Sequence, residues 1–131
     1  MAAPLPADVD ARLVRERNVW LCTLRPDGSP HVTPVWFVHV DGIWWVCCEA
    51  GSVKARNVAA DPRVSLALEN GDHPVVAEGA ARLHGDFPPA VVRAFADKYD
   101  GWDIRQPVTL DSGRVLLEIP VRRWLLAGTA H

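Results

Sequence analysis

Short runs of apolar and β-branched residues alternate with turn signals along most of the chain, a pattern typical of antiparallel strands. The first run covers residues 19–25 and is followed by a turn over residues 26–29. The second run covers residues 30–40 and ends at Asp41-Gly42, a dipeptide that favours a tight hairpin. A third run over residues 43–48 completes a predicted three-stranded meander.

The rest of the chain contains four more runs of this kind. Pro120 separates the last two, because proline cannot donate a hydrogen bond to a sheet ladder. Six or seven short, closely spaced strands are typical of a small antiparallel barrel. The four further predicted ranges are 63–69, 75–84, 114–119 and 121–127.

Two or three short helices are predicted between the strands. Residues 52–60 begin at Ser52, whose hydroxyl can cap a helix. Residues 8–14 form a second candidate, with Asp8 as its cap. Residues 90–99 form the third, with an apolar stripe at helical spacing made of Val92, Phe95, Ala96 and Tyr99.

The composition is that of an ordinary globular protein. Apolar residues make up 49% and charged residues 23% of the 131 positions, which excludes a disordered chain, a collagen-like repeat and a coiled coil. A chain of this length buries roughly two-thirds of its unfolded surface, which is enough for a core without disulfides or a metal. We therefore expect one mainly β domain over residues 1–131.

Charge and hydropathy exclude two kinds of partner. The net charge is −2, whereas proteins that bind nucleic acid usually show a basic excess. No apolar run approaches the ~20 residues of a membrane span. Residues 1–10 lack the basic and apolar regions of a signal peptide. The sequence predicts a cytoplasmic protein with neither nucleic acid nor membrane as a partner.

The sequence contains no familiar motif for catalysis or metal binding. It has no G-x-S-x-G, P-loop, G-x-G-x-x-G or H-E-x-x-H pattern, and its five histidines are scattered. Cys47 and Cys48 would point to opposite faces of a strand, so no metal site is predicted. We identify no catalytic residue, and an enzyme of this sequence would depend on a bound cofactor for its chemistry.

Residues 51–57 are the strongest candidate for an anion site. They follow a predicted strand, pass through a glycine and open a helix, whose N-terminal N–H groups attract anions. Ser52 adds a hydroxyl, and Lys54 and Arg56 add cations that are unfavourable in a first helical turn unless an anion binds. The alternative is a solvated turn, and the local sequence leaves both interpretations open.

The predicted strand over residues 30–40 has a wholly apolar face and a mixed face. We expect the mixed face to point outward, where a half-polar surface suits a ligand or a partner subunit. Pro34 indicates an edge or a bulge, although a core strand with a bulge is the alternative. The apolar face consists of Val32, Pro34, Trp36, Val38 and Val40, and the mixed face of His31, Thr33, Val35, Phe37 and His39.

Six tryptophans are many for a chain of 131 residues. A barrel of this size cannot bury all of them, and aromatic residues are enriched in the cores of interfaces. We therefore expect the chain to form a homodimer through faces of its β-sheet.

Four segments in register resemble the pyridoxamine 5′-phosphate oxidase-like split β-barrel superfamily. The chain is most similar to its short branch, the flavin and deazaflavin oxidoreductases that include reductases dependent on coenzyme F-420. The resemblance covers residues 10 to 127. The segments are residues 24–37, 52–57, 61–64 and 77–79.

The resemblance implies a six-stranded antiparallel split β-barrel, the FMN-binding split barrel, that dimerises with two cofactor sites across the interface. The tricyclic ring would lie along Thr33, Pro34, Val35 and Trp36. The phosphate and the start of the cofactor tail would be held by Ser52, Lys54, Arg56 and Asn57.

The function implied by the resemblance is that of an oxidoreductase. Hydride would pass between reduced F-420 and a small unsaturated or carbonyl substrate. FMN is the alternative cofactor, and a non-catalytic protein that carries the flavin or deazaflavin is a different class of function. A flavin-free structural barrel or a haem-related barrel is a third possibility, which requires Lys54 and Arg56 to be incidental.

Overall fold

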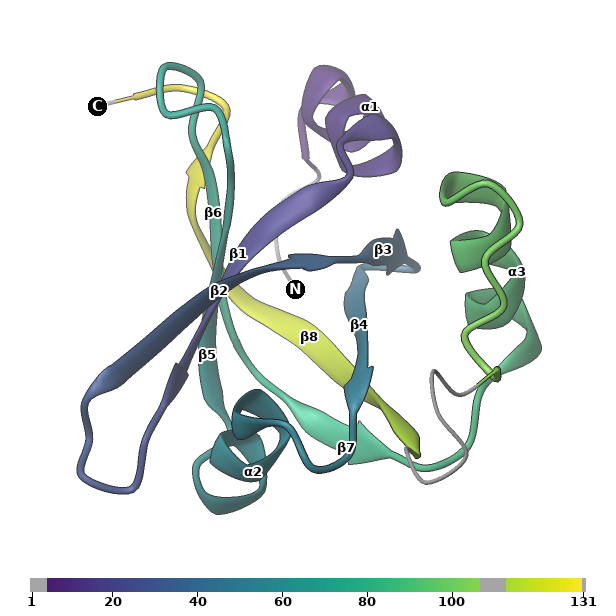
Figure 1. The fold of residues 1–131 in the computed structure, drawn as a ribbon. Helices are drawn as coiled ribbons and strands as arrows, with labels where there is room; N and C mark the ends of the chain where they lie inside the picture. Colours follow the sequence, from purple (N-terminus) through teal and green to yellow (C-terminus); the bar gives the residue numbers. More distant parts are fainter. Residues whose placement is uncertain (1–4, 107–112, 131) are drawn as a thin grey trace.

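The strands of the protein form one antiparallel sheet that curls into a half-barrel, with helices at its margins (Figure 1). This computed structural model describes residues 5–106 and 113–130. No helix in those ranges is long and apolar enough to span a membrane. The helices are α1 (Ala7–Arg15), α2 (Val53–Ala60) and α3 (Pro89–Lys98). The strands are β1 (Asn18–Leu24), β2 (Pro30–Trp36), β3 (Val38–Val40), β4 (Ile43–Glu49), β5 (Arg63–Leu68), β6 (Val75–Ala80), β7 (Arg82–His84) and β8 (Arg114–Ala127).

Two of the predicted strands are interrupted, and the eight strands described therefore correspond to six long ones. Residues 30–40 form β2 and β3, separated by Phe37, and residues 75–84 form β6 and β7, separated by Ala81. The sheet order is β2-β1-β5-β6-β8-β4-β3, with β7 paired to β8. β2 and β3 thus lie at opposite ends of the order, so the sheet stays open between its end strands. The predicted mainly β split-barrel fold is confirmed.

The last strand differs from its prediction, because β8 passes through Pro120 without a break. Up to Pro120 this strand pairs with β4 and β7, and from Val121 onward it pairs with β6. The proline lies where β8 changes partners, a position at which the missing N–H does little harm to the ladder. The predicted division into residues 114–119 and 121–127 is therefore wrong.

Turns and helix ends follow the local sequence signals, with one exception. Asp41 and Gly42 both have positive φ, 53° and 79°, as a tight hairpin of this type requires. The Ser52 hydroxyl accepts a hydrogen bond from the Ala55 N–H at 3.3 Å and caps α2 as predicted. The exception is α1, whose N-cap is Pro6; Asp8 lies in the first turn, where the helix dipole favours its carboxylate.

Apolar side chains form two cores on opposite faces of β4. Trp44 lies in the core inside the barrel, where Val9 and Leu13 of α1 also pack. Trp45 lies in a second core that α3 covers. The two rings are 0% and 6% exposed, so the neighbouring tryptophans do face opposite ways and both faces are buried.

α3 faces the second core along a stripe that differs from the predicted one. Val91, Phe95 and Tyr99 are buried, whereas the predicted Val92 and Ala96 are only half-buried. Both stripes have helical spacing, and the contact with the sheet selects between them.

The hydroxyl of Tyr99 ties the end of α3 to the junction between β2 and β3. It accepts a hydrogen bond from the backbone N–H of Phe37 at 2.8 Å. Its single O–H proton points to the carbonyl oxygen of Arg17 or that of Phe37, each of which lies 2.8 Å from the hydroxyl oxygen. Burial raises the pKa of Tyr99 to about 12, so the phenol keeps its proton at neutral pH.

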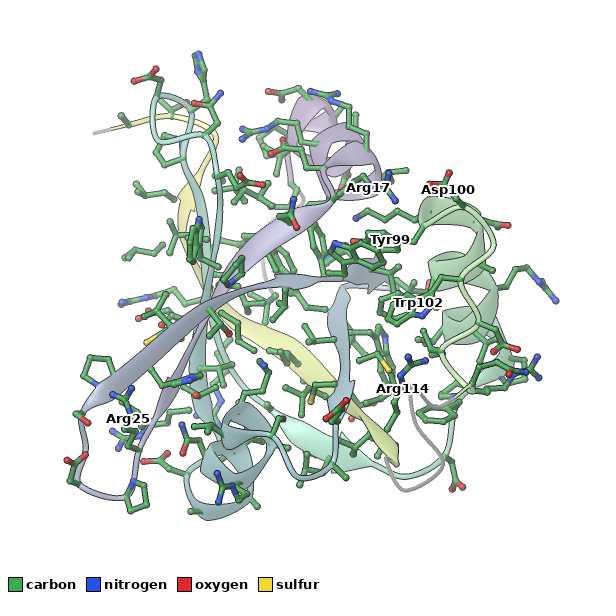
Figure 2. All side chains as sticks on the ribbon, viewed as in Figure 1. Arg17, Arg25, Tyr99, Asp100, Trp102 and Arg114 are labelled. Atoms are coloured by element: carbon green, nitrogen blue, oxygen red, sulfur yellow. The ribbon has the colours of Figure 1, made fainter. Side chains whose placement is uncertain are left out.

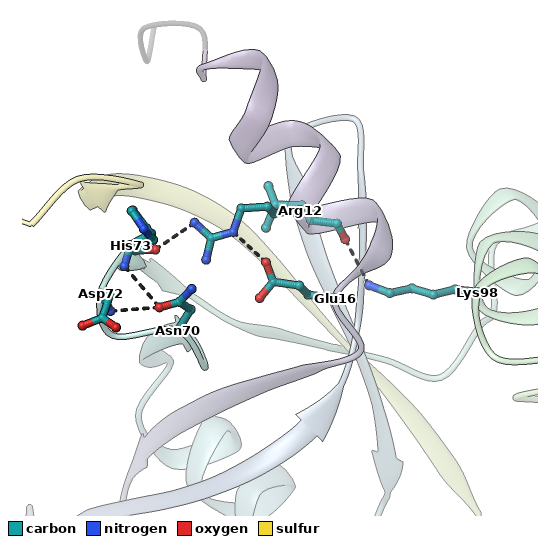
Figure 3. A network of polar contacts seen from close by, with 7 residues as sticks. Arg12, Glu16, Asn70, Asp72, His73 and Lys98 are labelled. Carbon is teal, nitrogen blue, oxygen red and sulfur yellow. Dashed lines mark hydrogen bonds and ion pairs between the residues drawn. The ribbon is translucent and has the colours of Figure 1, made fainter.

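Two long-range hydrogen bonds hold α1 against the barrel, and one local ion pair orients the arginine that makes the first of them (Figure 3). The Arg12 guanidinium donates to the carbonyl of His73 at 2.8 Å and pairs with Glu16 at 2.6 Å. From the other side, the Lys98 ammonium of α3 donates to the carbonyl of Leu13 at 3.0 Å. α1 is therefore fixed by both the β5–β6 turn and α3.

The close approach of β6 and β8 generates a testable prediction at Gly79. A Cβ atom at this position would fall well inside contact distance of the Pro120 carbonyl oxygen. We expect Gly79→Ala to lower the free energy of unfolding by about 1–3 kcal/mol, because the backbones must move apart. Gly71→Ala is the control, since its Cβ would meet open space, and it should leave stability nearly unchanged. Urea unfolding of both variants measures the difference, and equal stabilities would contradict the prediction.

Candidate functional site

A cavity of about 350 Å³ lies where the sheet is open, between β2, β4 and the N-terminus of α2. β2 ends the strand order, so one of its edges pairs with no strand among the described residues. The cavity therefore adjoins backbone groups that are free to bind a ligand. It is lined by Val35, Trp36, Cys47, Cys48, Glu49, Ser52, Lys54 and Trp102.

The N-terminus of α2 supplies the donors of this cavity. The hydroxyl and carbonyl oxygens of Ser52 accept from the backbone N–H groups of Ala55 and Arg56. In the described residues no acceptor meets the N–H groups of Val53 and Lys54, which belong to the positive end of the helix dipole. The Lys54 side chain lines the same cavity, so the arrangement suits an anion.

The structure brings four of the eight predicted site residues to this cavity: Val35, Trp36, Ser52 and Lys54. Thr33 lies two residues before Val35 on the same side of β2, and its hydroxyl oxygen is buried without a partner in the described residues. Thr33 itself does not line the cavity. Pro34 points the other way and is exposed.

Like Thr33 and Pro34, the last two predicted residues, Arg56 and Asn57, do not line the cavity. Arg56 is exposed on the surface of α2, one residue beyond the buried Ala55. The Asn57 side chain is buried and donates to the hydroxyl of Thr23 on β1 at 3.0 Å. This bond joins α2 to the barrel, so Asn57 holds the helix that carries Ser52 and Lys54.

The two faces of β2 are reversed relative to the sequence prediction. Val32, Pro34 and Trp36 point outward, and the mixed face points into the barrel. Val32 is 53% and Trp36 44% exposed. The reason is packing at Phe37, which is fully buried and brings the mixed face inward with it.

An aromatic cluster forms one wall of the site. The Trp36 ring stacks on Tyr99 with centroids 4.5 Å apart, and Trp102 meets Trp36 edge-on at 5.3 Å. The Arg17 guanidinium lies 5.1 Å from the Tyr99 ring and pairs with Asp100 at 3.3 Å (Figure 2). The cluster holds the Trp36 ring in one orientation beside the cavity.

Sequence reasoning missed four residues that line the cavity. Cys47, Cys48 and Glu49 directly precede the predicted anion segment, and their position at the end of a strand was the available signal. Trp102 follows α3 in an irregular segment, far along the chain from the other lining residues. No local signal points from Trp102 to the cavity.

The chemistry of the cavity is that of binding and orientation. Burial raises the pKa of Cys47 to about 12 and also raises the pKa of Cys48, so both thiols are uncharged at neutral pH. Lys54 and Glu49 are the charged side chains of the wall. The described residues contain no cluster of three side chains that could hold a metal ion. The site can bind an anion next to a flat apolar group.

Comparison with known proteins supports the split-barrel fold. None of the curated proteins matches the chain. An F-420 reductase superposes with a TM-score of 0.73 at 24% identity, covering 92% of this chain and 98% of its own. A conserved hypothetical protein of Mycobacterium tuberculosis gives 0.75 at 31% identity, over 93% of this chain and 83% of its own. HutZ, the haem storage protein of Vibrio cholerae, gives 0.76 at 16% identity, over 98% of both chains.

The family model named pyridoxamine 5′-phosphate oxidase matches residues 5–127, which include every strand and helix described above. The chain belongs to the pyridoxamine 5′-phosphate oxidase family of split β-barrels.

Proposed function

We propose that the cavity binds a flavin-type cofactor and that the chain is an oxidoreductase that uses the deazaflavin coenzyme F-420. The observation that carries the proposal is the position of the cavity, between the unpaired edge of β2 and the N-terminus of α2. One side offers an apolar strand edge and the other a cationic turn with free N–H groups. These two surfaces are complementary to the planar ring and the phosphate of one cofactor.

The residues present fit such a cofactor. Ser52, Lys54 and the free N–H groups of α2 would hold the phosphate. Arg56, exposed on the same helix, would reach the phosphate or the tail from outside. Residues 33–36 would lie along the ring, with the unpaired edge of β2 beside it.

When bound in its reduced form, the cofactor supplies a hydride to a small unsaturated or carbonyl substrate, which also takes up a proton. The protein orients the ring against β2 and excludes water from it. Trp36 and Trp102 line the cavity as an aromatic corner, which suits a flat ring or a conjugated substrate. Because Cys47 and Cys48 hold their protons, neither supplies a nucleophilic thiolate that could attack the ring.

FMN is the second candidate cofactor, because its phosphate and ring fit the same features. A carrier without catalysis is also compatible with the cavity, since no lining residue stands out as a proton donor. Haem is less well supported. It needs an axial ligand such as His, Met or a thiolate, whereas the described lining residues include no His or Met and the Cys47 and Cys48 thiols hold their protons.

The proposal includes a homodimer with the cofactor sites at its interface. Trp20 of β1 is 43% exposed and pairs with Pro34 of β2. Together with Val32 and Trp36 they form an apolar outer face, which we call the β1–β2 face. Apolar surface of this kind usually marks an interaction site. Trp36 belongs to both the β1–β2 face and the cavity, so a partner on this face would help to enclose the cofactor.

The assignment of the anion site predicts different effects for Lys54 and Asn57. Lys54→Ala or Arg56→Ala should weaken cofactor binding ~10- to 150-fold, because each removes a charge-assisted hydrogen bond. Neither change should alter the melting temperature without ligand. Asn57→Ala should instead lower the free energy of unfolding by about 1–3 kcal/mol, since it leaves the buried Thr23 hydroxyl unpaired. Calorimetric titration and thermal melts measure both quantities, and wild-type affinity in both cation variants would refute the phosphate assignment.

The choice of cofactor is tested by titrating F-420 and FMN at low and high salt. F-420 carries carboxylates beyond its phosphate, so its binding should be tighter and should fall more steeply with salt. Reduced F-420 should also be reoxidised by a small activated alkene or quinone in the presence of the protein. Tighter FMN binding in both conditions would assign the chain to FMN, and binding without turnover would make it a carrier. Saturable binding of haem with neither flavin bound would overturn the proposal.

The proposed dimer predicts that Val32→Asp breaks the assembly. An interface on the β1–β2 face should bury at least ~1,200 Å², and a carboxylate at its centre cannot be solvated there. Val14→Asp is a matched control, because Val14 is also exposed, at 70%, but lies on α1. Sedimentation at micromolar concentration should show a dimer for the wild type and the control, and a monomer for Val32→Asp. A monomeric wild type would contradict the shared-site arrangement.

A further inference from the structure

A second and larger cavity, of about 440 Å³, lies between α1, β3 and α3. We call it the α1–α3 pocket. Its size is within the range of small-molecule sites. It has no lining residue in common with the cofactor cavity. The cofactor proposed above therefore leaves this pocket unexplained.

The pocket has an apolar interior. Leu13 of α1, Val38 and Val40 of β3, and Ala94 of α3 line it. Leu13 and Val38 are themselves buried in the cores, so this part of the wall is rigid. A ligand would gain free energy by placing a hydrocarbon group against these side chains.

The charged side chains around the pocket are mainly cationic. Lys98, Arg15 and Arg17 line it, against one carboxylate, Asp97. Arg17 forms an ion pair with Asp100, whereas Arg15 has no ion-pair partner in the described part of the chain. The resulting positive potential favours an anion.

Lys98 is half-buried, whereas Arg15 and Arg17 are exposed to solvent. The Lys98 ammonium donates one hydrogen bond, to the carbonyl of Leu13, and lies 3.6 Å from the centroid of the Phe37 ring. Within residues 5–106 and 113–130 no carboxylate lies within ion-pair distance of it. Glu16, whose charge also acts on Lys98, is bound to Arg12. Burial lowers the pKa of Lys98 to about 8, as expected for an ammonium without an anionic partner.

The His39 ring is a further unpartnered group. It lines the pocket, and its Nε2 atom is buried with no hydrogen-bond partner in the described residues. Burial lowers the pKa of His39, so the ring is neutral at pH 7. The ring packs edge-on against Trp44 and Trp124 in the barrel, with centroids 5.5 Å and 6.1 Å away, so it adds no charge to the pocket wall.

We propose that the α1–α3 pocket binds a small monocarboxylate with an apolar body, whose carboxylate pairs with Lys98 and whose hydrocarbon part lies against Leu13, Val38, Val40 and Ala94. An anion without an apolar part would leave the apolar side chains of the pocket hydrated. An apolar molecule without charge would leave the Lys98 ammonium without an anionic partner. The two halves of the pocket together select an amphipathic acid of medium length.

Octanoate is a suitable probe, with 1-octanol as its uncharged counterpart. Calorimetric titration of the full chain, with and without F-420, should show saturable binding of one octanoate per chain in both states. Octanol should bind much more weakly. Lys98→Met keeps the length of the side chain and removes the charge, and it should weaken octanoate binding at least about tenfold with little effect on octanol.

Two further variants make the experiment decisive. Ala94→Phe fills the pocket without changing any charge and should abolish octanoate binding while F-420 or FMN still binds. This variant decides the outcome if Lys98→Met does not fold. Lys54→Met, in the cofactor cavity, should leave octanoate binding unchanged. The proposal is overturned if the wild type does not bind octanoate, if Ala94→Phe binds it normally, or if Lys54→Met is the variant that loses it.

Discussion

The hydroxyl of Tyr99 holds the junction where β2 ends and β3 begins, and the geometry of the site depends on it. β2 and β3 are consecutive in the sequence but lie at opposite ends of the strand order, so the chain must leave the sheet between them, at Phe37. The backbone groups at this break lose their ladder partners and need other hydrogen bonds. Tyr99 supplies one of these bonds to the buried N–H of Phe37. The same residue stacks its ring on Trp36, so a single side chain at the C-terminal end of α3 sets both the course of the backbone and the orientation of an aromatic wall.

The two cavities lie on either side of this junction and have different chemistry. The proposed cofactor cavity combines a free strand edge with a helix N-terminus, which is suited to a ring and a phosphate. The α1–α3 pocket combines an apolar wall with an ammonium that lacks a carboxylate. Phe37 and Tyr99 separate them: Lys98 of the α1–α3 pocket lies over the Phe37 ring, and Trp36 of the cofactor cavity lies on the Tyr99 ring.

Local features of the fold and the placement of Ser52 and Lys54 at the start of a helix were determined by the sequence alone. The hairpin at Asp41-Gly42 and the cap at Ser52 depend on the conformational preferences of a few adjacent residues, which a short window contains. The position of Lys54 in the first turn of α2 follows from that cap. Alternation along the chain also placed Trp44 and Trp45 on opposite faces correctly.

Only the tertiary structure decided which face of each element is buried and which distant residues meet. Both faces of β2 are apolar enough to be buried, and the contacts of Phe37 turned the mixed face inward. Asn57 turned toward Thr23 and away from the cavity, because a buried amide needs a partner and β1 provides one. Trp102 reaches the cavity from beyond α3, through packing between residues far apart in the sequence, which no local pattern encodes.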